Sequence, residues 1–200
     1  MGIAERKLRQ KEEIRNLILD TAWQIVKQEG WQALSLRRIA DAIEYSVPVI
    51  YDHFENKEAI MLALSQQGFA LLGKKLQQAK EKENNPALQL QGIADTYWNF
   101  AFRHKEYYQL MFGLGMPCCN IDQCVPQKSM FRNMIMEPIE RLIRAGGKRN
   151  IDRDFKYHAF WSVLHGLVSI KMLGSANAQE TLNKHALEDA VKGFIRNLEN

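Results

Sequence analysis

The amino-acid sequence predicts an all-α protein of about nine helices, with a small N-terminal three-helix domain and a larger C-terminal helical bundle. Apolar residues recur at spacings of three and four in almost every segment, which is the period of a helix packed on one side. Gly and Pro number only 12 and 5 among 200 residues, so long loops should be few. No segment alternates apolar and polar residues as a half-buried strand does.

The first predicted helix covers residues 11–29. Its apolar stripe consists of Ile14, Leu17, Ile18, Ala22, Ile25 and Val26. Glu12 and Glu13 lie in the first turn, where the helix dipole favours acidic side chains. Gly30 follows as a natural end, because glycine adopts the backbone conformations that terminate helices.

Two short helices are predicted next. Ser35 is a suitable N-cap for the first of them, and residues 44–46 form a tight turn. Ser46 caps the second, which has Pro48 in its first turn, where a missing N–H costs little, and which runs to about Phe54. Two short helices joined by a three-residue turn, after a longer supporting helix, are typical of a helix-turn-helix unit.

The two faces of this unit differ in chemistry. The residues expected to face inward are Ile39, Ala40, Ile43, Ile50 and Phe54. Those expected to project outward from the last helix are Val47, Pro48, Val49, Tyr51, Asp52 and His53. A helix that presents such a set could enter the major groove of DNA, which is about 12 Å wide.

The rest of the chain predicts longer helices. Asn56 caps a helix that reaches about Lys82, and Asn85 with Pro86 opens the next one. The later helices are expected at about 86–104, 104–114, 127–145, 152–173 and 179–198. Residues 115–126 are expected to form a loop. We therefore expect a domain over 1–56 and a second over 57–200.

Charge and composition restrict the function. The net charge is +4, but residues 1–60 hold 9 basic and 10 acidic side chains, so any DNA contact there depends on local placement of charge. The N-terminus lacks the apolar core of a signal peptide. The longest apolar run, FWSVLHGLVSI, is shorter than the roughly 20 residues that span a bilayer. We expect a cytoplasmic protein with no membrane contact.

The three cysteines, Cys118, Cys119 and Cys124, lie in the predicted loop. Their spacing lacks the C-x2-C pairs of structural zinc sites, and no histidine is near in sequence. We expect free thiols, with metal binding or thiol sensing as the alternative. The prediction is therefore that the protein has no metal and no cofactor.

The segment GWQALSLRRIADAIEYSVPVIYDHFENKEAI resembles the DNA-binding domain of the TetR family of transcriptional regulators. The matching positions are Gly30, Leu34, Ser35, Leu36, Ile39, Ala40, Ser46, Pro48, Ile50, Tyr51, His53, Phe54, Lys57 and Glu58. The resemblance implies a homodimer that binds a palindromic operator in double-stranded DNA. It also implies a larger domain that binds a small-molecule effector and forms the dimer through the two C-terminal helices.

The resemblance also implies roles for single residues. It gives contacts with DNA phosphates to Ser35, Tyr51, His53 and Lys57. Ser46 caps the recognition helix beside the base-facing residues Val47, Pro48 and Val49, whose apolar side chains could contact thymine methyl groups. Arg37 and Arg38 could reach a phosphate or a base. A charged N-terminal arm could cross the DNA backbone or minor groove through Arg6, Lys7, Arg9 and Lys11.

Two positions depart from the family pattern. Glu44 stands where the family usually has glycine, and a left-handed backbone there would cost a non-glycine residue about 1 kcal/mol. Tyr45 stands where a small aliphatic residue is usual, and we expect it to fill the space between the two short helices. The turn should therefore form in a slightly altered way.

The C-terminal part resembles one TetR subgroup marked by Trp, His and Gly, here Trp161, His165 and Gly166. Met and aromatic residues suit adaptable apolar pockets. We expect a pocket lined by some of Trp98, Phe102, Tyr108, Met111, Phe112, Met134, Trp161 and His165. Core packing is the alternative for most of them, and for His165 in particular.

Apolar stripes on the last two helices could form a dimer interface or face the chain's own core. They comprise Phe160, Val163, Leu164, Leu167, Val168 and Ile170, then Leu187, Val191, Phe194, Ile195 and Leu198. The sequence therefore predicts a ligand-responsive repressor that an apolar or amphipathic effector releases from DNA. A helical-bundle enzyme and a protein-binding adaptor are the alternatives, but no catalytic motif is present.

Overall fold

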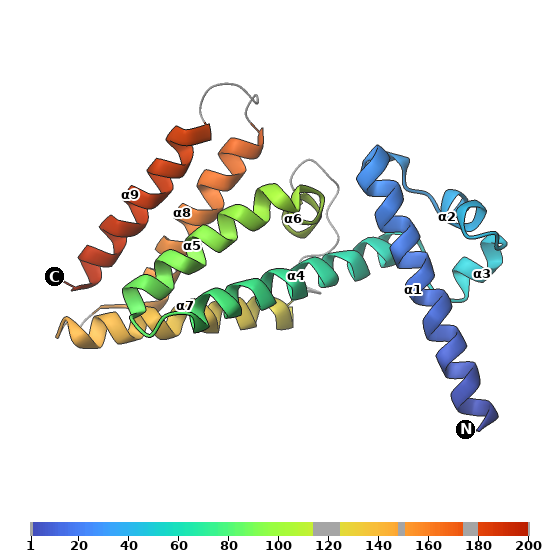
Figure 1. The fold of residues 1–200 in the computed structure, drawn as a ribbon, viewed down its shortest axis with the longest axis horizontal. Coiled ribbons are helices and arrows are strands. Elements are labelled where there is room, and N and C mark those ends of the chain that lie inside the picture. Colours follow the sequence, from blue (N-terminus) through green and yellow to red (C-terminus); the bar gives the residue numbers. More distant parts are fainter. Residues whose placement is uncertain (1, 114–124, 148–150, 174–179, 200) are drawn as a thin grey trace. The chain divides into compact units, whose positions relative to one another are not determined.

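The computed structural model describes all residues except 1, 114–124, 148–150, 174–179 and 200. Within the described residues there are nine α-helices and a short 3-10 helix, and no strand, which confirms the all-α prediction (Figure 1). The chain divides into two compact units. The first contains residues 1–68 and 106–123, and the second contains 69–105 and 124–200, apart from the positions just excluded.

The first unit is built on a small apolar core. Its helices are α1 (Ile3–Glu29), the 3-10 helix (Trp31–Ala33), α2 (Leu36–Ala42), α3 (Val47–Tyr51), the first part of α4 (Lys57–Glu81), and α6 (Lys105–Phe112). Its fully buried residues include Ile18, Ala22, Val26, Leu34, Ile39, Ala40, Ile50, Phe54, Ile60 and Leu64. The inward face that the sequence predicts for the two short helices is thus confirmed.

Helix α1 begins at Ile3, well before the predicted start at residue 11. Its first turns are exposed, so they show no apolar stripe by which sequence periodicity could detect them. Local contacts hold them instead: the Gly2 N–H donates to Glu5 at 2.8 Å, and Arg9 pairs with Glu13 at 3.1 Å, one turn along the helix.

The predicted helix end at Gly30 and the caps Ser35, Asn56 and Asn85 are present, but the prediction that Ser46 caps α3 is wrong, because its side chain forms no cap hydrogen bond. Gly30 ends α1 with a φ of +83°. Asn56 Oδ1 accepts from the Ala59 N–H at 2.8 Å at the start of α4. Asn85 Oδ1 accepts from two backbone N–H groups at the start of α5 (Pro86–Arg103), at 2.8 and 3.3 Å. Because such caps satisfy N–H groups that a helix leaves unpaired, they fix where each helix begins.

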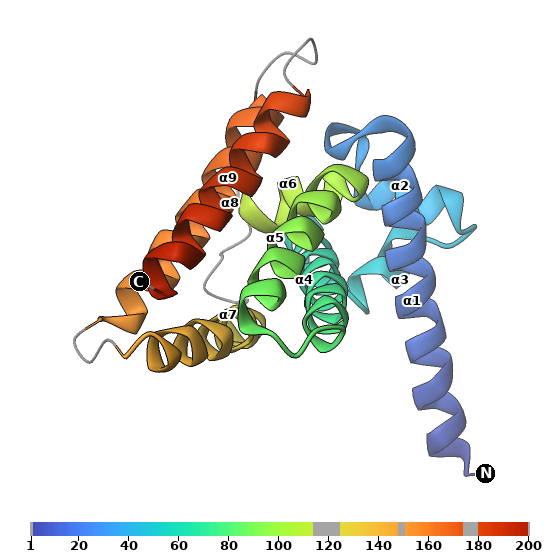
Figure 2. The same cartoon turned by 60° about the vertical axis from the view of Figure 1, so that its left-hand side comes forward.

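The second unit consists of the rest of α4, α5, α7 (Val125–Ala145), α8 (Arg153–Leu173) and α9 (Glu180–Glu199). Helix α5 packs against α7, α8 and α9, and α8 packs against α9 (Figure 2). Helix α7 begins at Val125, inside the loop predicted over 115–126. The other residues of that loop lie outside the described residues, and so do the three cysteines, Cys118, Cys119 and Cys124. No described helix combines the length and apolar character that crossing a bilayer requires.

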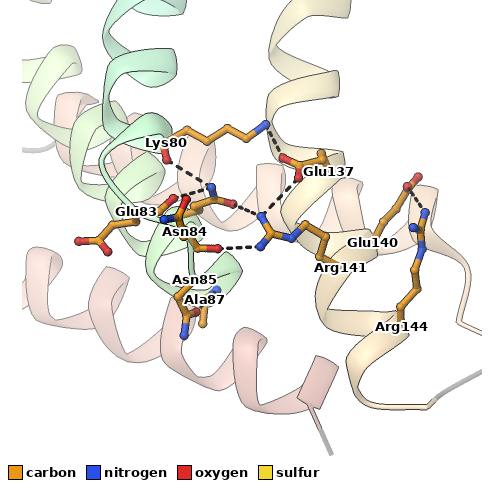
Figure 3. A network of polar contacts seen from close by, with 10 residues as sticks. Lys80, Glu83, Asn84, Asn85, Ala87, Glu137, Glu140, Arg141 and Arg144 are labelled. Atoms are coloured by element: carbon orange, nitrogen blue, oxygen red, sulfur yellow. Dashed lines mark hydrogen bonds and ion pairs between the residues drawn. The ribbon is translucent and has the colours of Figure 1, made fainter.

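A polar network joins the α4–α5 turn to α7 (Figure 3). Arg141 donates to the Asn84 carbonyl at 2.7 Å and to Gln89 Oε1 at 3.3 Å. The Gln89 amide donates in turn to the carbonyls of Lys80 and Glu83, at 3.3 and 2.7 Å. Gln89 is buried, and its amide has partners on both atoms, so the network satisfies a polar group that would otherwise be costly inside the unit.

The apolar stripes of α8 and α9 mostly face their own unit. The buried members are Phe160, Leu164, Val168, Leu187, Val191, Ile195 and Leu198. Of the predicted interface residues only Ile170 is largely exposed, while Val163, Leu167 and Phe194 are half-buried. Two residues outside the predicted stripes, Phe155 and Leu182, are also exposed. The structure therefore assigns most of both stripes to the core.

Candidate nucleic-acid interface and ligand-binding residues

The N-terminal end of helix α2 has backbone N–H groups that could hold a phosphate. Ser35 has extended backbone angles, and its hydroxyl accepts from the Arg38 N–H at 3.2 Å. The remaining first-turn N–H groups point away from the helix, where the dipole favours an anion. Ser35 thus serves as the predicted cap and lies at the position expected of a phosphate contact.

The two arginines that follow Ser35 differ. Arg38 pairs with Glu29 at the end of α1, at 2.5 Å, and donates to the Ala33 carbonyl at 3.3 Å. The hydrogen bond from Arg38 lowers the pKa of Glu29. Arg37 is exposed and only loosely paired with Asp41, at 3.9 Å. Arg37 is therefore the more available of the two for DNA, whereas Arg38 joins α2 to α1.

The turn between α2 and α3 is a regular Schellman motif with Glu44 in the left-handed position. Glu44 has a φ of +59° and is the one non-glycine residue with positive φ in the described chain. The Tyr45 N–H donates to the Ala40 carbonyl at 3.0 Å, and the Glu44 N–H donates to Asp41 at 3.4 Å. Tyr45 is 43% exposed, so the expectation that it fills the gap between the helices is wrong.

Helix α3 ends at Tyr51, sooner than predicted, and presents a narrower face than expected. Ser46 and Pro48 are exposed, and Tyr51 is 56% exposed. Val49 is half-buried, and Val47 packs against the core, so its predicted outward position is wrong in part. A five-residue helix on an apolar core must use one side for packing, which leaves few positions to face outward.

His53 follows α3 and is half-buried. Its Nδ1 is buried with no hydrogen-bond partner among the described residues, and its carbonyl accepts from Arg15 at 3.3 Å. The Arg15 guanidinium also lies 4.2 Å from the centre of the Phe54 ring. Burial, and then the positive charge of Lys11, lower the pKa of His53. At neutral pH its imidazole is therefore uncharged and can offer one N–H donor.

Lys57, at the start of α4, donates to the Trp31 carbonyl at 3.4 Å. Its ammonium group has further donors that remain available to a phosphate. The basic residues of the expected arm, Arg6, Lys7, Arg9 and Lys11, are exposed side chains of helix α1, so the arm is helical.

Five of the predicted pocket residues lie in the second unit. Four of them form two aromatic pairs, and the fifth, Met134, is buried. Trp98 and Phe102 lie 4.8 Å apart between ring centres, and Lys171 Nζ lies 5.1 and 4.5 Å from them. The Trp161 and His165 rings are stacked at 6.1 Å. Sequence reasoning missed Lys171, although a lysine inside an apolar helical run was a usable signal.

His165 has polar neighbours on both ring nitrogens. Its Nδ1 lies 3.1 Å from the Tyr97 hydroxyl, and its Nε2 lies 3.5 Å from the Ser169 hydroxyl. The Tyr97 ring meets Trp161 edge-on at 5.2 Å. Burial lowers the pKa of His165, so the ring is neutral at pH 7. This arrangement fits the core histidine that the sequence offered as an alternative.

The other three predicted pocket residues, Tyr108, Met111 and Phe112, belong to the first unit. Tyr108 and Met111 are buried there, and the Tyr108 and Phe112 rings lie 4.6 Å apart. Met111 lies so close to Gly68 that a Cβ at that position would be 2.8 Å from its sulfur. A pocket lined by some of these eight residues remains a prediction.

Two parts of the chain match known protein families. Residues 18–64 match the family described as bacterial regulatory proteins, tetR family. Residues 90–193 match the description tetracyclin repressor-like, C-terminal domain. The HTH-type transcriptional activator FasR of Mycolicibacterium smegmatis is 26% identical over 102 residues, which is 51% of this chain. The match spans about half of that relative, 47% of its length.

Solved structures share the fold. A protein of unknown function from Rhodococcus sp. RHA1 has a TM-score of 0.75 at 24% identity and covers 93% of this chain and 95% of its own. AibR, in complex with isovaleryl coenzyme A and operator DNA, has a TM-score of 0.64 at 17% identity and covers 90% of this chain and 96% of its own. At these identities the likeness concerns the fold.

Proposed function

Because the chain belongs to the tetR family of bacterial regulatory proteins, we propose that it is a homodimeric repressor that binds a palindromic operator and is released by a small amphipathic effector. We assign DNA binding to residues 1–56, and effector binding and dimerisation to 57–200. The protein would act without catalysis, in the bacterial cytoplasm where its DNA target lies.

The observation that carries the proposal is the exposed edge of the helix-turn-helix. The free start of α2 at Ser35 offers backbone N–H groups to one phosphate. The exposed end of α3 offers the Tyr51 hydroxyl to another, and Pro48 to a base. A short helix held between two phosphate contacts has the register that direct readout in the major groove requires.

The DNA proposal is tested by selecting bound fragments of the source genome and sequencing them. We expect enrichment of a palindromic site whose halves lie about 34 Å apart, or a multiple of this spacing. Higher salt should weaken binding, because phosphate contacts release counterions. Recovery of random fragments, at the same level as for a Tyr51→Ala variant, would refute operator binding.

An exposed stripe on α8 supports the homodimer. Phe155 and Ile170 are 65% and 66% exposed, and Ala159 and Gly166 lie between them at helical spacing. A Cβ added at Gly166 would meet nothing within 4 Å, so another backbone could approach there. Two copies of this stripe related by a twofold axis would bury each other. They would form a closed dimer with no further copy of the stripe left to bind.

Effector control would act by changing the distance between the two DNA-reading heads. Helix α4 has residues in both compact units, so its position could respond to a ligand and affect the helix-turn-helix. An effector that binds the DNA-free state more tightly shifts the population away from the operator-bound state. AibR, which shares the fold, forms a complex with isovaleryl coenzyme A, an amphipathic thioester, and operator DNA.

The direction of regulation needs its own experiment, since FasR carries the name of an activator. We propose a reporter gene behind the selected operator, with and without expression of this chain. Repression predicts a lower signal when the chain is present. A higher signal that disappears with Tyr51→Ala would overturn repression and retain DNA binding.

A further inference from the structure

We propose that a groove between α4 and α5 binds the phosphate groups of an organic ligand. The groove lies within the second unit and has a volume of about 270 Å³. Residues of α4 and its end form one wall, and residues of α5 and its end form the other. It is distinct from the aromatic clusters around Trp98 and Trp161.

The charged side chains that line the groove are all basic. Its lining includes Lys75, Lys82 and Arg103, and no carboxylate lines it. In the described part of the chain no acidic side chain forms an ion pair with any of these three. Lys75 is half-buried, while Lys82 and Arg103 are exposed.

Two acidic residues on α4 and α7, Glu81 and Glu137, are engaged elsewhere. Glu81 accepts from the Gln77 amide at 2.6 Å. Glu137 pairs with Lys80 at 2.5 Å, and the hydrogen bond from Lys80 lowers the pKa of Glu137 (Figure 3). Lys80 is thus neutralised on the α7 side, whereas Lys75 and Lys82 remain available on the groove side.

Neutral groups in the groove complete the chemistry of an anion site. Thr96 and Asn99 offer hydrogen-bond donors, and the His104 ring lies 4.9 Å from that of Phe100. Three cations with hydroxyl and amide donors suit a diphosphate or several phosphates better than a single carboxylate, because each phosphate brings several acceptor oxygens.

This inference rests on the proposed function, since it names the charged part of the effector. A phosphorylated carrier with an apolar group would be an amphipathic ligand of the expected kind. The groove would hold its phosphates, and the apolar part would lie elsewhere.

The test is calorimetric titration of the full chain with inorganic pyrophosphate, followed by titration with coenzyme A. We expect both to bind, and pyrophosphate to compete with coenzyme A. The double substitution Lys75→Gln and Arg103→Gln should weaken both at least tenfold. Lys74→Gln is the matched control, because Lys74 is the exposed neighbour of Lys75 on α4 and does not line the groove. It should change the affinity less than twofold.

Three outcomes would overturn the inference: neither probe binds, Lys74→Gln weakens binding as much as the double substitution, or coenzyme A binds without competition from pyrophosphate. Unchanged urea unfolding of the variants would exclude misfolding. The titration contains no DNA, so it can succeed or fail whether or not the chain selects an operator. Loss of operator binding would refute the proposed function and leave the anion site standing.

Discussion

At the residue scale, the left-handed backbone of Glu44 costs conformational free energy that no ion pair of its side chain offsets. Its left-handed backbone suits glycine, and Glu44 forms no ion pair among the described residues. We expect Glu44→Gly to raise the free energy of unfolding by about 1 kcal/mol. For a chain of this size the melting temperature should rise by roughly 2–4 °C.

The control for Glu44→Gly is Glu44→Ala. Alanine removes the charge but keeps the Cβ that makes the left-handed conformation costly. If strain is the cause, only glycine stabilises the protein in a thermal melt. Equal stabilisation by both variants would show instead that the charge of Glu44 is responsible.

Ser35 and Ser46 form a natural pair for testing helix caps. The Ser35 hydroxyl caps α2, whereas the Ser46 hydroxyl forms no cap bond with α3. Ser35→Ala should lower the free energy of unfolding by about 1 kcal/mol. Ser46→Ala should lower it by less than about 0.5 kcal/mol. Urea unfolding monitored by circular dichroism measures both, and a larger loss for Ser46→Ala would contradict the assignment.

Protonation of His165 should make stability depend on pH. Burial depresses its pKa in the folded state, so the unfolded chain binds the proton more readily. Stability is then fully retained above the unfolded pKa of about 6.5 and falls as the pH decreases through it. Unfolding measured from pH 7.5 to 5 should show a flatter profile for His165→Gln than for the wild type. The same substitution at His185, exposed on α9, should keep the wild-type slope.

At the scale of elements, Arg141 donates to the Asn84 carbonyl, to Gln89 and to Glu137, whereas the exposed Arg144 pairs with Glu140 one turn away on the same helix. Arg141→Ala should lower the free energy of unfolding by about 1–3 kcal/mol, because Gln89 and the Asn84 carbonyl lose a charged donor. Arg144→Ala removes only the pair with Glu140, and its effect should stay below about 1 kcal/mol. Faster amide exchange in residues 82–85 for Arg141→Ala alone would locate the effect in the α4–α5 turn.

The helices themselves were largely predictable because their ends depend on local chemistry. Ser35, Asn56 and Asn85 cap their helices through hydrogen bonds that reach two or three residues along the chain. Tertiary placement was not predictable in this way. Val47 and the apolar stripe predicted over Phe160–Ile170 consist of apolar residues. Whether these residues face the core depends on elements distant in sequence, which the periodicity of one segment cannot reveal.

The candidate site was predictable to the same extent. Ser35 caps α2 and Tyr51 is exposed at the end of α3, as their spacing predicts, whereas their contacts with DNA stay a prediction. The groove of Lys75 and Arg103 was missed, because residues so far apart in sequence meet only through the packing of α4 and α5. The division of the predicted pocket residues between two units has the same cause.

At the scale of the whole molecule, dimerisation should depend on the α8 face that carries Phe155, Ala159, Gly166 and Ile170. Ile170→Asp should convert a dimer to a monomer with little change in folding, because Ile170 is 66% exposed in the single chain. Leu88→Asp, at a position 43% exposed on α5 outside the stripe, is the matched control and should leave the dimer intact. Sedimentation velocity measures both, and a dimer that survives Ile170→Asp would place the interface elsewhere.

The left-handed turn at Glu44 also has a genetic consequence. Glutamate and glycine codons differ by one purine transition at the second base, so the relaxed turn is a single mutational step away. A library made by error-prone replication and selected for growth at elevated temperature should therefore recover this change early. The turn between α2 and α3 is thus a position where one substitution should raise thermal stability without any change in the core.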